Sequence, residues 1–146
     1  MQAPHNILLV EDNPADVEIT LEAFRRSSTG NRVYVCRDGE EALDYLFQRG
    51  RHARAGSAPR PDLILLDLNL PGISGQEVLQ QIKQNEHLKE IPVVVLTTSD
   101  RDEDVDRCYG SGANSYLTKP VQFDECLKLV VEIQRYWLTL SKLPPR

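Results

Sequence analysis

Five polar side chains that could bind a cation or a phosphoryl group each follow a short strand-like segment of the sequence. They are, in chain order, Glu11, Asp12, Asp67, Thr97 and Lys119. Each residue type is common in turns, so any one of them alone indicates little. Their recurrence after separate segments suggests that they share one site.

Three of these residues are acids, Glu11, Asp12 and Asp67. Crowded carboxylates repel one another and raise one another's pKa unless a divalent cation lies among them. A small set of hard oxygen ligands with room for water suits Mg²⁺. The acids therefore predict a magnesium site.

The remaining residues are suited to binding a phosphoryl group beside that cation. A carboxylate next to Mg²⁺ can attack phosphorus and form an aspartyl phosphate. Asp67 is the expected nucleophile because it follows the central strand of the set, whereas Glu11 and Asp12 are adjacent and better placed to share the cation. The Thr97 hydroxyl and the Lys119 ammonium would then stabilise the phosphoryl oxygens.

The elements that must position these residues alternate between strand and helix patterns. Three continuous apolar runs and two weaker candidates predict five strands: Ile7–Val10, Arg32–Cys36, Leu63–Leu66, Val93–Leu96 and Ser115–Thr118. Helix-start signals between and after them are Asn13-Pro14, Asp38, Ser74, Ser99 and Pro120. This alternation predicts an α/β fold, a doubly wound parallel sheet with helices on both faces, whose ligands bind beyond the carboxyl ends of the strands.

One connection is unusually long. Residues Arg49–Pro61 are rich in Arg, Gly and Pro and lack an apolar period, so we expect an exposed, solvated loop. The three cysteines and three histidines of the chain are scattered. We expect free, reduced thiols and solvated imidazoles, and no histidine-based metal site.

Composition restricts the class of protein. The chain has 146 residues and a formal net charge of -5, without a basic run. This charge argues against direct binding to DNA or to an anionic membrane. No apolar run approaches the roughly 20 residues of a membrane span, and the first residues lack an apolar signal core. We therefore expect a cytoplasmic protein.

Together these residues resemble the receiver domains of two-component signalling, also called response regulators. The matching segments are VEDNP (Val10–Pro14), LLDLNLPGISG (Leu65–Gly75), VVVLTTS (Val93–Ser99) and YLTKP (Tyr116–Pro120). The match runs from about Asn6 to Tyr136, and the spacing from Asp67 to Thr97 to Lys119 agrees with the family. The resemblance implies a flavodoxin-like sheet of strand order 2-1-3-4-5 with five helices.

The resemblance also implies a role for each site residue. Asp67 would be the phosphoacceptor, and Asp12 and Asp67 would bind Mg²⁺ through their side chains. Glu11 would act mainly through water, and Asn69 would offer its backbone carbonyl to the cation.

A switch is implied as well. Thr97 and Lys119 would bind the phosphoryl group, and Tyr116 would be the aromatic residue that turns inward behind Thr97 on activation. The signal would reach a face made of the fourth helix, the fifth strand and the fifth helix.

The expected organisation is a receiver domain over residues 6–140, a tail over 141–146 and no output domain. The partner would be a sensor histidine kinase. The long loop, the segment NPAD and the amphipathic tail are similar to single-domain regulators that partner bacterial phytochrome histidine kinases. Tyr136, Trp137, Leu138 and Leu140 extend apolar surface beyond what the core needs, which suggests a homodimer or a kinase-docking surface.

Three other classes remain open. A Mg²⁺-dependent phosphohydrolase would need an acid two residues after Asp67, where the chain has Asn69. A nucleotide-binding module would need a glycine-rich phosphate loop, and neither standard motif is present. A pseudo-receiver would bind partners without phosphate, which the complete acidic set with Thr97 and Lys119 disfavours.

Overall fold

A computed structural model describes residues 4–27 and 30–145, so Arg146, the last residue of the expected tail, lies outside the described residues. The strands are β1 (Asn6–Val10), β2 (Arg32–Cys36), β3 (Leu63–Leu66), β4 (Val93–Thr97) and β5 (Ser115–Thr118). All pair in parallel, in the order β2-β1-β3-β4-β5. The predicted fold class and strand order are confirmed.

The helices are α1 (Pro14–Ser27), α2 (Gly39–Phe47), α3 (Gly75–Gln84), α4 (Asp102–Gly110) and α5 (Phe123–Arg135). A short 3-10 turn, η1 (Gly50–His52), follows α2, and a π-helical turn, η2 (Tyr136–Leu140), extends α5. Among the described residues, no helix is both long and apolar enough to cross a membrane.

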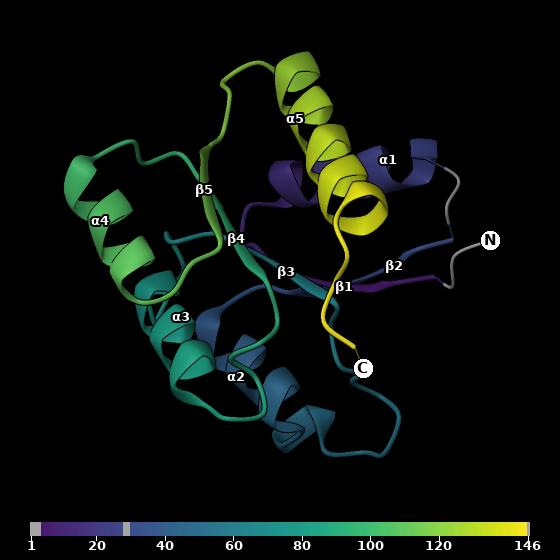
Figure 1. The fold of residues 1–146 in the computed structure, drawn as a ribbon, viewed down its shortest axis with the longest axis vertical. Coiled ribbons are helices and arrows are strands. Elements are labelled where there is room, and N and C mark those ends of the chain that lie inside the picture. The colour runs from purple at the N-terminus through teal and green to yellow at the C-terminus, as the bar shows by residue number, and fades with distance from the viewer. Residues whose placement is uncertain (1–3, 28–29, 146) are drawn as a thin grey trace.

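The helices form two layers on the sheet (Figure 1). Alternate side chains of a strand point to opposite faces. In β1, Ile7 and Leu9 pack with α1 and α5, whereas Leu8 and Val10 pack with α2 and α3. Both faces of the central strands are therefore buried, which is why their sequences read as unbroken apolar runs.

Three of the predicted helix starts are confirmed. The Asn13 side chain accepts hydrogen bonds from the amides of Ala15 and Asp16 at 2.9 and 3.2 Å. The Asp38 and Ser74 side chains likewise accept from amides in the first turns of α2 and α3. These bonds satisfy amides that have no partner within the helix.

The other two starts were placed too early. Ser99 is not the cap, because α4 begins at Asp102 and Arg101 precedes it. The Ser99 hydroxyl donates to the carboxylate of Asp104 and accepts from the amide of Arg101, which lies outside the helix, at 3.4 Å. Helix α5 begins at Phe123, three residues after Pro120, because Gln122 keeps an extended backbone.

The apolar C-terminal segment divides into buried and exposed side chains. Leu138 is buried and packs in the core beneath α1 and α5, and Trp137 is partly buried there. Leu138 follows the buried Gln134 by four residues, so both lie on the inner side of the helix. Only Tyr136 and Leu140 are exposed, which corrects the expectation that all four residues are surplus to the core.

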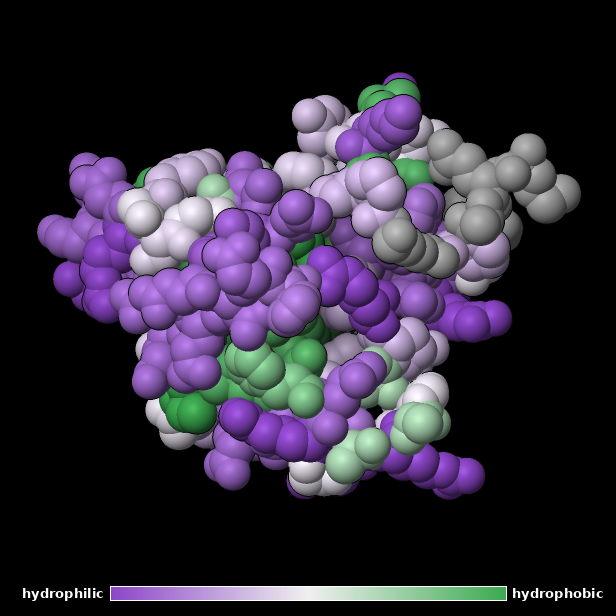
Figure 2. Space-filling model, turned by 60° about the horizontal axis from the view of Figure 1, so that its bottom comes forward, coloured by the Kyte–Doolittle hydropathy of each residue, from purple (hydrophilic) through white to green (hydrophobic). Residues whose placement is uncertain are grey.

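The long loop is more closely held than expected. Much of Arg49–Pro61 is exposed, but Ala58 is buried, and Tyr45 donates a hydrogen bond to the carbonyl of Pro59 at 2.8 Å. Gln48 donates to the carbonyl of Ala58 at 3.2 Å. The surface at this lower end of the molecule is mainly hydrophilic, with apolar side chains gathered in limited patches (Figure 2).

A glycine fixes the position of α3 beside the carboxyl end of β3. A Cβ atom on Gly75 would lie 2.2 Å from the carbonyl oxygen of Asp67 and 2.6 Å from the Cα of Leu68. The amide of Gly75 donates to the carbonyl of Leu68 at 3.1 Å. Both obstacles are backbone atoms, which cannot rotate away as a flexible side chain could.

Gly75→Ala should therefore lower the free energy of unfolding by about 1–3 kcal/mol, because the helix must move away from β3. Gly110→Ala is the matched control, since no atom lies within 4 Å of its Cβ position at the end of α4. The control should be neutral or stabilising by up to about 1 kcal/mol. Urea denaturation measures both, and equal effects would contradict the steric argument.

Candidate functional site

The site lies where the carboxyl ends of four parallel strands meet. Backbone hydrogen bonds continue the strand pairing for one residue beyond the strands: the amide of Asp67 donates to Val10 at 3.0 Å, and that of Lys119 donates to Thr97 at 2.7 Å. Asp67, directly after β3, and Lys119, directly after β5, are thereby each held by the neighbouring strand. This explains how side chains far apart in sequence reach the same place.

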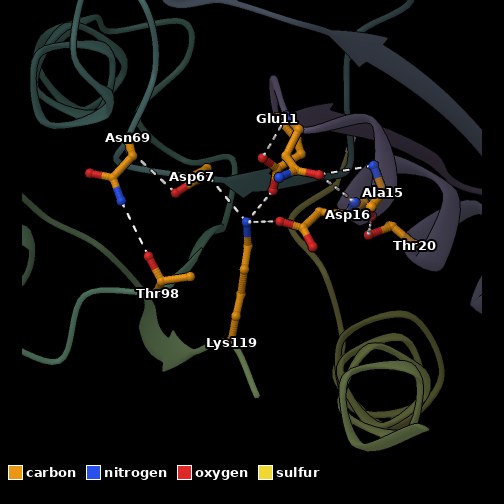
Figure 3. A network of polar contacts seen from close by, with 9 residues as sticks. Glu11, Ala15, Asp16, Thr20, Asp67, Asn69, Thr98 and Lys119 are labelled. Carbon is orange, nitrogen blue, oxygen red and sulfur yellow. Dashed lines mark hydrogen bonds and ion pairs between the residues drawn. The ribbon is translucent and has the colours of Figure 1, made fainter. Parts of the chain in front are cut away.

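The Lys119 ammonium lies at the centre of the site (Figure 3). Its Nζ contacts the Asp16 carboxylate at 2.9 Å and the Asp67 carboxylate at 3.1 Å, and it also pairs with Glu11. Lys119, Glu11 and Asp67 are all buried. Charge-assisted hydrogen bonds of this kind are stronger than neutral ones and compensate for removing the charges from water.

Asp16 is the site residue that sequence reasoning missed. It lies in the first turn of α1, three residues after the cap Asn13. An acid there is favoured by the helix dipole alone, so its type and position gave no separate indication of a site. Only the packing of α1 against the sheet shows that it reaches Lys119.

Three acids lie close enough together to hold a metal ion. Oxygen atoms of Glu11, Asp12 and Asp67 are within 4.8 Å of one another. Glu11 and Asp67 are buried and Asp12 is exposed, so the group opens toward solvent on one side. All three offer carboxylate oxygens, the ligand type that Mg²⁺ prefers, and Mg²⁺ usually keeps several water ligands beside them.

Asn69 lies beside this group. Its amide donates to Oδ1 of Asp67 at 3.2 Å, and its side chain donates to the Thr98 hydroxyl at 3.4 Å. The side chain is exposed and carries no acidic proton. The backbone amide of Asn69 can therefore orient Asp67, whereas its side chain cannot act as a general acid.

The charges of the site shift the pKa values of its members. Burial raises the pKa of Glu11 to about 7, opposed by the hydrogen bond with Lys119 and assisted by the negative charge of Asp67. Burial acts to lower the pKa of Lys119, but its contacts with Glu11, Asp16 and Asp67 outweigh burial and raise it. The lysine is therefore a permanent cation, whereas Glu11 is close to exchanging its proton near neutral pH.

Thr97 and Tyr116 lie on the same side of the sheet. Thr97 is completely buried, and its hydroxyl has no hydrogen-bond partner in the described part of the chain. Tyr116 pairs with Val95 in register and is partly buried against the core on the α3–α4 side. Its hydroxyl donates to the carbonyl of Ser99 at 2.8 Å.

The residues expected to form the site are brought together. Glu11, Asp12, Asp67 and Lys119 form one cluster, Asn69 borders it, and the buried Thr97 adjoins Lys119 through their backbones. The missing partner of the Thr97 hydroxyl is notable, because buried polar atoms are nearly always hydrogen-bonded.

Known proteins share this arrangement of fold and sequence. Residues 7–131 match the family described as the response regulator receiver domain. The probable methanogenesis regulatory protein FilR2 of Methanothrix harundinacea is 47% identical over 141 residues, which cover 97% of this chain and 88% of FilR2. Response regulator Rcp1 of Synechocystis sp. is 45% identical over 97% of this chain and 94% of Rcp1.

Solved structures agree closely with the fold. The phosphorylated cyanobacterial phytochrome response regulator RcpA superposes with a TM-score of 0.93 at 45% identity, covering 98% of this chain and all of RcpA. The Mn²⁺-bound form of Rcp1 superposes with a TM-score of 0.92 at 45% identity, covering 97% of this chain and all of that structure. The chain therefore belongs to the response regulator receiver domain family.

Proposed function

We propose that this receiver accepts a phosphoryl group from a histidine kinase on Asp67, in a reaction that requires Mg²⁺. The position of Asp67 is the main support for this proposal. Its carboxylate is buried, contacts Lys119 at 3.1 Å and lies within 4.8 Å of carboxylate oxygens of Glu11 and Asp12. A buried nucleophile between a cation-binding group and a fixed ammonium has what phosphoryl transfer requires.

The transfer balances as a substitution at phosphorus. An ionised oxygen of Asp67 attacks the phosphoryl group of a phosphohistidine, a P–O bond forms, and the P–N bond breaks. The donor imidazole leaves with the electron pair. Lys119 stays protonated and stabilises the negative charge that the transferred oxygens retain.

We assign the cation to Glu11, Asp12 and Asp67, with the Asn69 carbonyl as a further ligand. The hard oxygen set fits Mg²⁺, and the Mn²⁺ bound to Rcp1, a 45% identical relative, supports a divalent ion. When bound, the ion supplies positive charge to a phosphoryl oxygen and to the acids around it. Ionisation of Glu11 and binding of the cation should favour each other.

We assign the switch to Thr97 and Tyr116. The unpartnered hydroxyl of Thr97 is free to donate to a phosphoryl oxygen on Asp67. The Tyr116 ring lies on the same side of the sheet, and its hydroxyl joins β5 to the segment between β4 and α4. A change at Thr97 would therefore alter the face formed by α4, β5 and α5 by shifting a population.

We infer that the partner is a phytochrome histidine kinase, because RcpA is described as a cyanobacterial phytochrome response regulator and is 45% identical over almost the whole chain. We place the exchange in the cytoplasm and expect no direct binding to DNA, given the net charge of -5. The receiver would span residues 6–140, followed by a short tail over residues 141–146.

Self-association is part of this proposal. Tyr136 and Leu140 are exposed at the end of the α4, β5 and α5 face. A surface hollow between β5 and α5 is lined by Leu117, Leu129 and Trp137, among others. Apolar surface of this kind is typical of protein interfaces.

A phosphohydrolase is not favoured. Asn69 occupies the position that would need an acid to protonate a leaving group. The family match is to the response regulator receiver domain, and Rcp1 is a response regulator.

Mass spectrometry of the intact protein tests the phosphorylation of Asp67. Incubated with acetyl phosphate and Mg²⁺, the protein should gain one phosphoryl group, and Asp67→Asn should gain none. Asp106→Asn, on the exposed side of α4, is the matched control and should react like the unchanged protein. Modification of Asp67→Asn, or steady release of phosphate from p-nitrophenyl phosphate, would contradict the receiver mechanism.

The variant Thr97→Ala tests whether Thr97 couples phosphorylation of Asp67 to self-association. The variant should still gain a phosphoryl group, because Asp67 and Lys119 are unchanged, but it should lose most of the change in self-association that phosphorylation causes. Light scattering at micromolar concentration, with and without beryllofluoride as a phosphoryl mimic, measures this. A response equal to that of the unchanged protein would remove Thr97 from the switch.

Glu11 should make stability depend on pH in the absence of metal. Its pKa rises from 4.5 to about 7 on folding, so the folded state prefers the protonated form. The stabilisation is complete below pH 4.5 and is lost as pH rises through 7. The free energy of unfolding should fall over this window by on the order of 1–3 kcal/mol.

Denaturation in EDTA across this pH range measures the decline. Glu11→Gln, which cannot ionise, should show less of it, and Mg²⁺ should reduce it in the unchanged protein because the cation favours the ionised carboxylate. Identical pH profiles for the variant and the unchanged protein would refute the assignment to Glu11.

A further inference from the structure

A second group of side chains with metal-binding chemistry lies at the carboxyl end of β2, beside the start of α2. Cys36 is the last residue of β2, Glu41 is in the first turn of α2, and His52 ends η1. The Sγ, carboxylate and imidazole atoms of these residues lie within 4.8 Å of one another. The sequence led us to expect a solvated His52, whereas its side chain is only 17% exposed.

Each side chain is held in place by its surroundings. Cys36 is completely buried. Glu41 accepts a hydrogen bond from the amide of Arg37 at 2.9 Å through one carboxylate oxygen, which leaves Oε2 turned toward His52. The His52 ring packs edge-on against Tyr45, with ring centroids 5.2 Å apart. The three groups therefore do not depend on mobile surface side chains for their position.

The imidazole has a nitrogen without a hydrogen bond near the Glu41 carboxylate. Nε2 of His52 is buried and has no hydrogen-bond partner among residues 4–27 and 30–145. It lies 3.7 Å from Oε2 of Glu41, too far for a hydrogen bond. A buried nitrogen left without a partner is costly, and a metal ion would use its lone pair.

The spacing and the ligand types both suit zinc. Nitrogen and oxygen ligands about 2.0–2.1 Å from a tetrahedral zinc ion lie about 3.3 Å from each other, so the 3.7 Å between His52 and Glu41 needs only a small adjustment. A thiolate, a carboxylate and a neutral imidazole carry two negative charges, which a divalent ion neutralises. Soft thiolate and imidazole ligands select against Mg²⁺.

We propose that Cys36, Glu41 and His52 form a site for a zinc-type divalent ion, with water as the fourth ligand. The site is separate from the acidic cluster of Glu11, Asp12 and Asp67. Binding cross-links the end of β2, the start of α2 and the first turn of the long loop. It therefore holds η1 against the body of the domain.

Two competing interactions set the conditions for binding. Arg51 contacts Glu41 at 3.2 Å, but its side chain is 74% exposed and can withdraw into solvent. Burial, with the negative charge of Glu41, raises the pKa of the Cys36 thiol to about 12. Metal binding must therefore displace the thiol proton, and affinity should increase with pH.

Cobalt distinguishes this site from the acidic one. With Mg²⁺ in large excess to occupy the carboxylates, Co²⁺ added to the reduced full-length protein should produce a near-ultraviolet thiolate-to-cobalt band with one ion bound per chain. Zn²⁺ should bleach the band by competition. A spectrum without a thiolate band, or binding of Co²⁺ that excess Mg²⁺ abolishes, would overturn the proposal.

The ligands are tested by substitution. His52→Gln, which is partly exposed and should leave the fold intact, should weaken Zn²⁺ binding by at least about tenfold, since even outer-shell partners contribute 10- to 100-fold. Cys36→Ser should remove the thiolate band. Cys108→Ser is the matched control, because Cys108 is also a free, buried thiol but lies in α4. Loss of the band in Cys108→Ser, or an unchanged affinity in His52→Gln, would place the metal elsewhere.

Discussion

The site depends on one ammonium group shared by three carboxylates. Lys119 reaches Glu11 after β1, Asp67 after β3 and Asp16 in α1, so it connects three elements that are distant in sequence. Without it, buried acids at one edge of the sheet would repel one another, and burying them would be costly. The lysine supplies an internal positive charge, and the exposed Asp12 leaves the cluster open to a second cation.

Much of this arrangement was predictable because parallel sheets bring strand ends together. The apolar runs in the sequence identify β1, β3 and β4, and the polar residues that end or follow these runs are the ones that meet at the site. Asp16 could not be found in this way, because its position depends on how α1 packs on the sheet. The starts of α4 and α5 were also misplaced. The Ser99 hydroxyl binds the side chain of Asp104, and Gln122 keeps an extended backbone, and helix-start propensity describes neither feature.

The long loop shows the same limit more strongly. Its composition predicted exposure, and most of it is exposed, but hydrogen bonds from Tyr45 and Gln48 at the end of α2 hold it. The loop brings His52 beside Cys36 and Glu41, and these three residues have no recognisable spacing in the sequence, because they come from a strand, a helix and a 3-10 turn. The backbone links this group to the acidic cluster, since the amide of Glu11 donates to the carbonyl of Cys36 at 2.9 Å.

The sharing of one ammonium has a consequence for measurement. If one carboxylate is removed, Nζ of Lys119 can move toward the remaining two, so the energy lost is smaller than the original contact was worth. Effects of substitutions at Glu11, Asp16 and Asp67 should consequently not add, and single replacements will understate what each acid contributes. Thermodynamic cycles that combine pairs of replacements are the appropriate way to apportion the energy of this cluster.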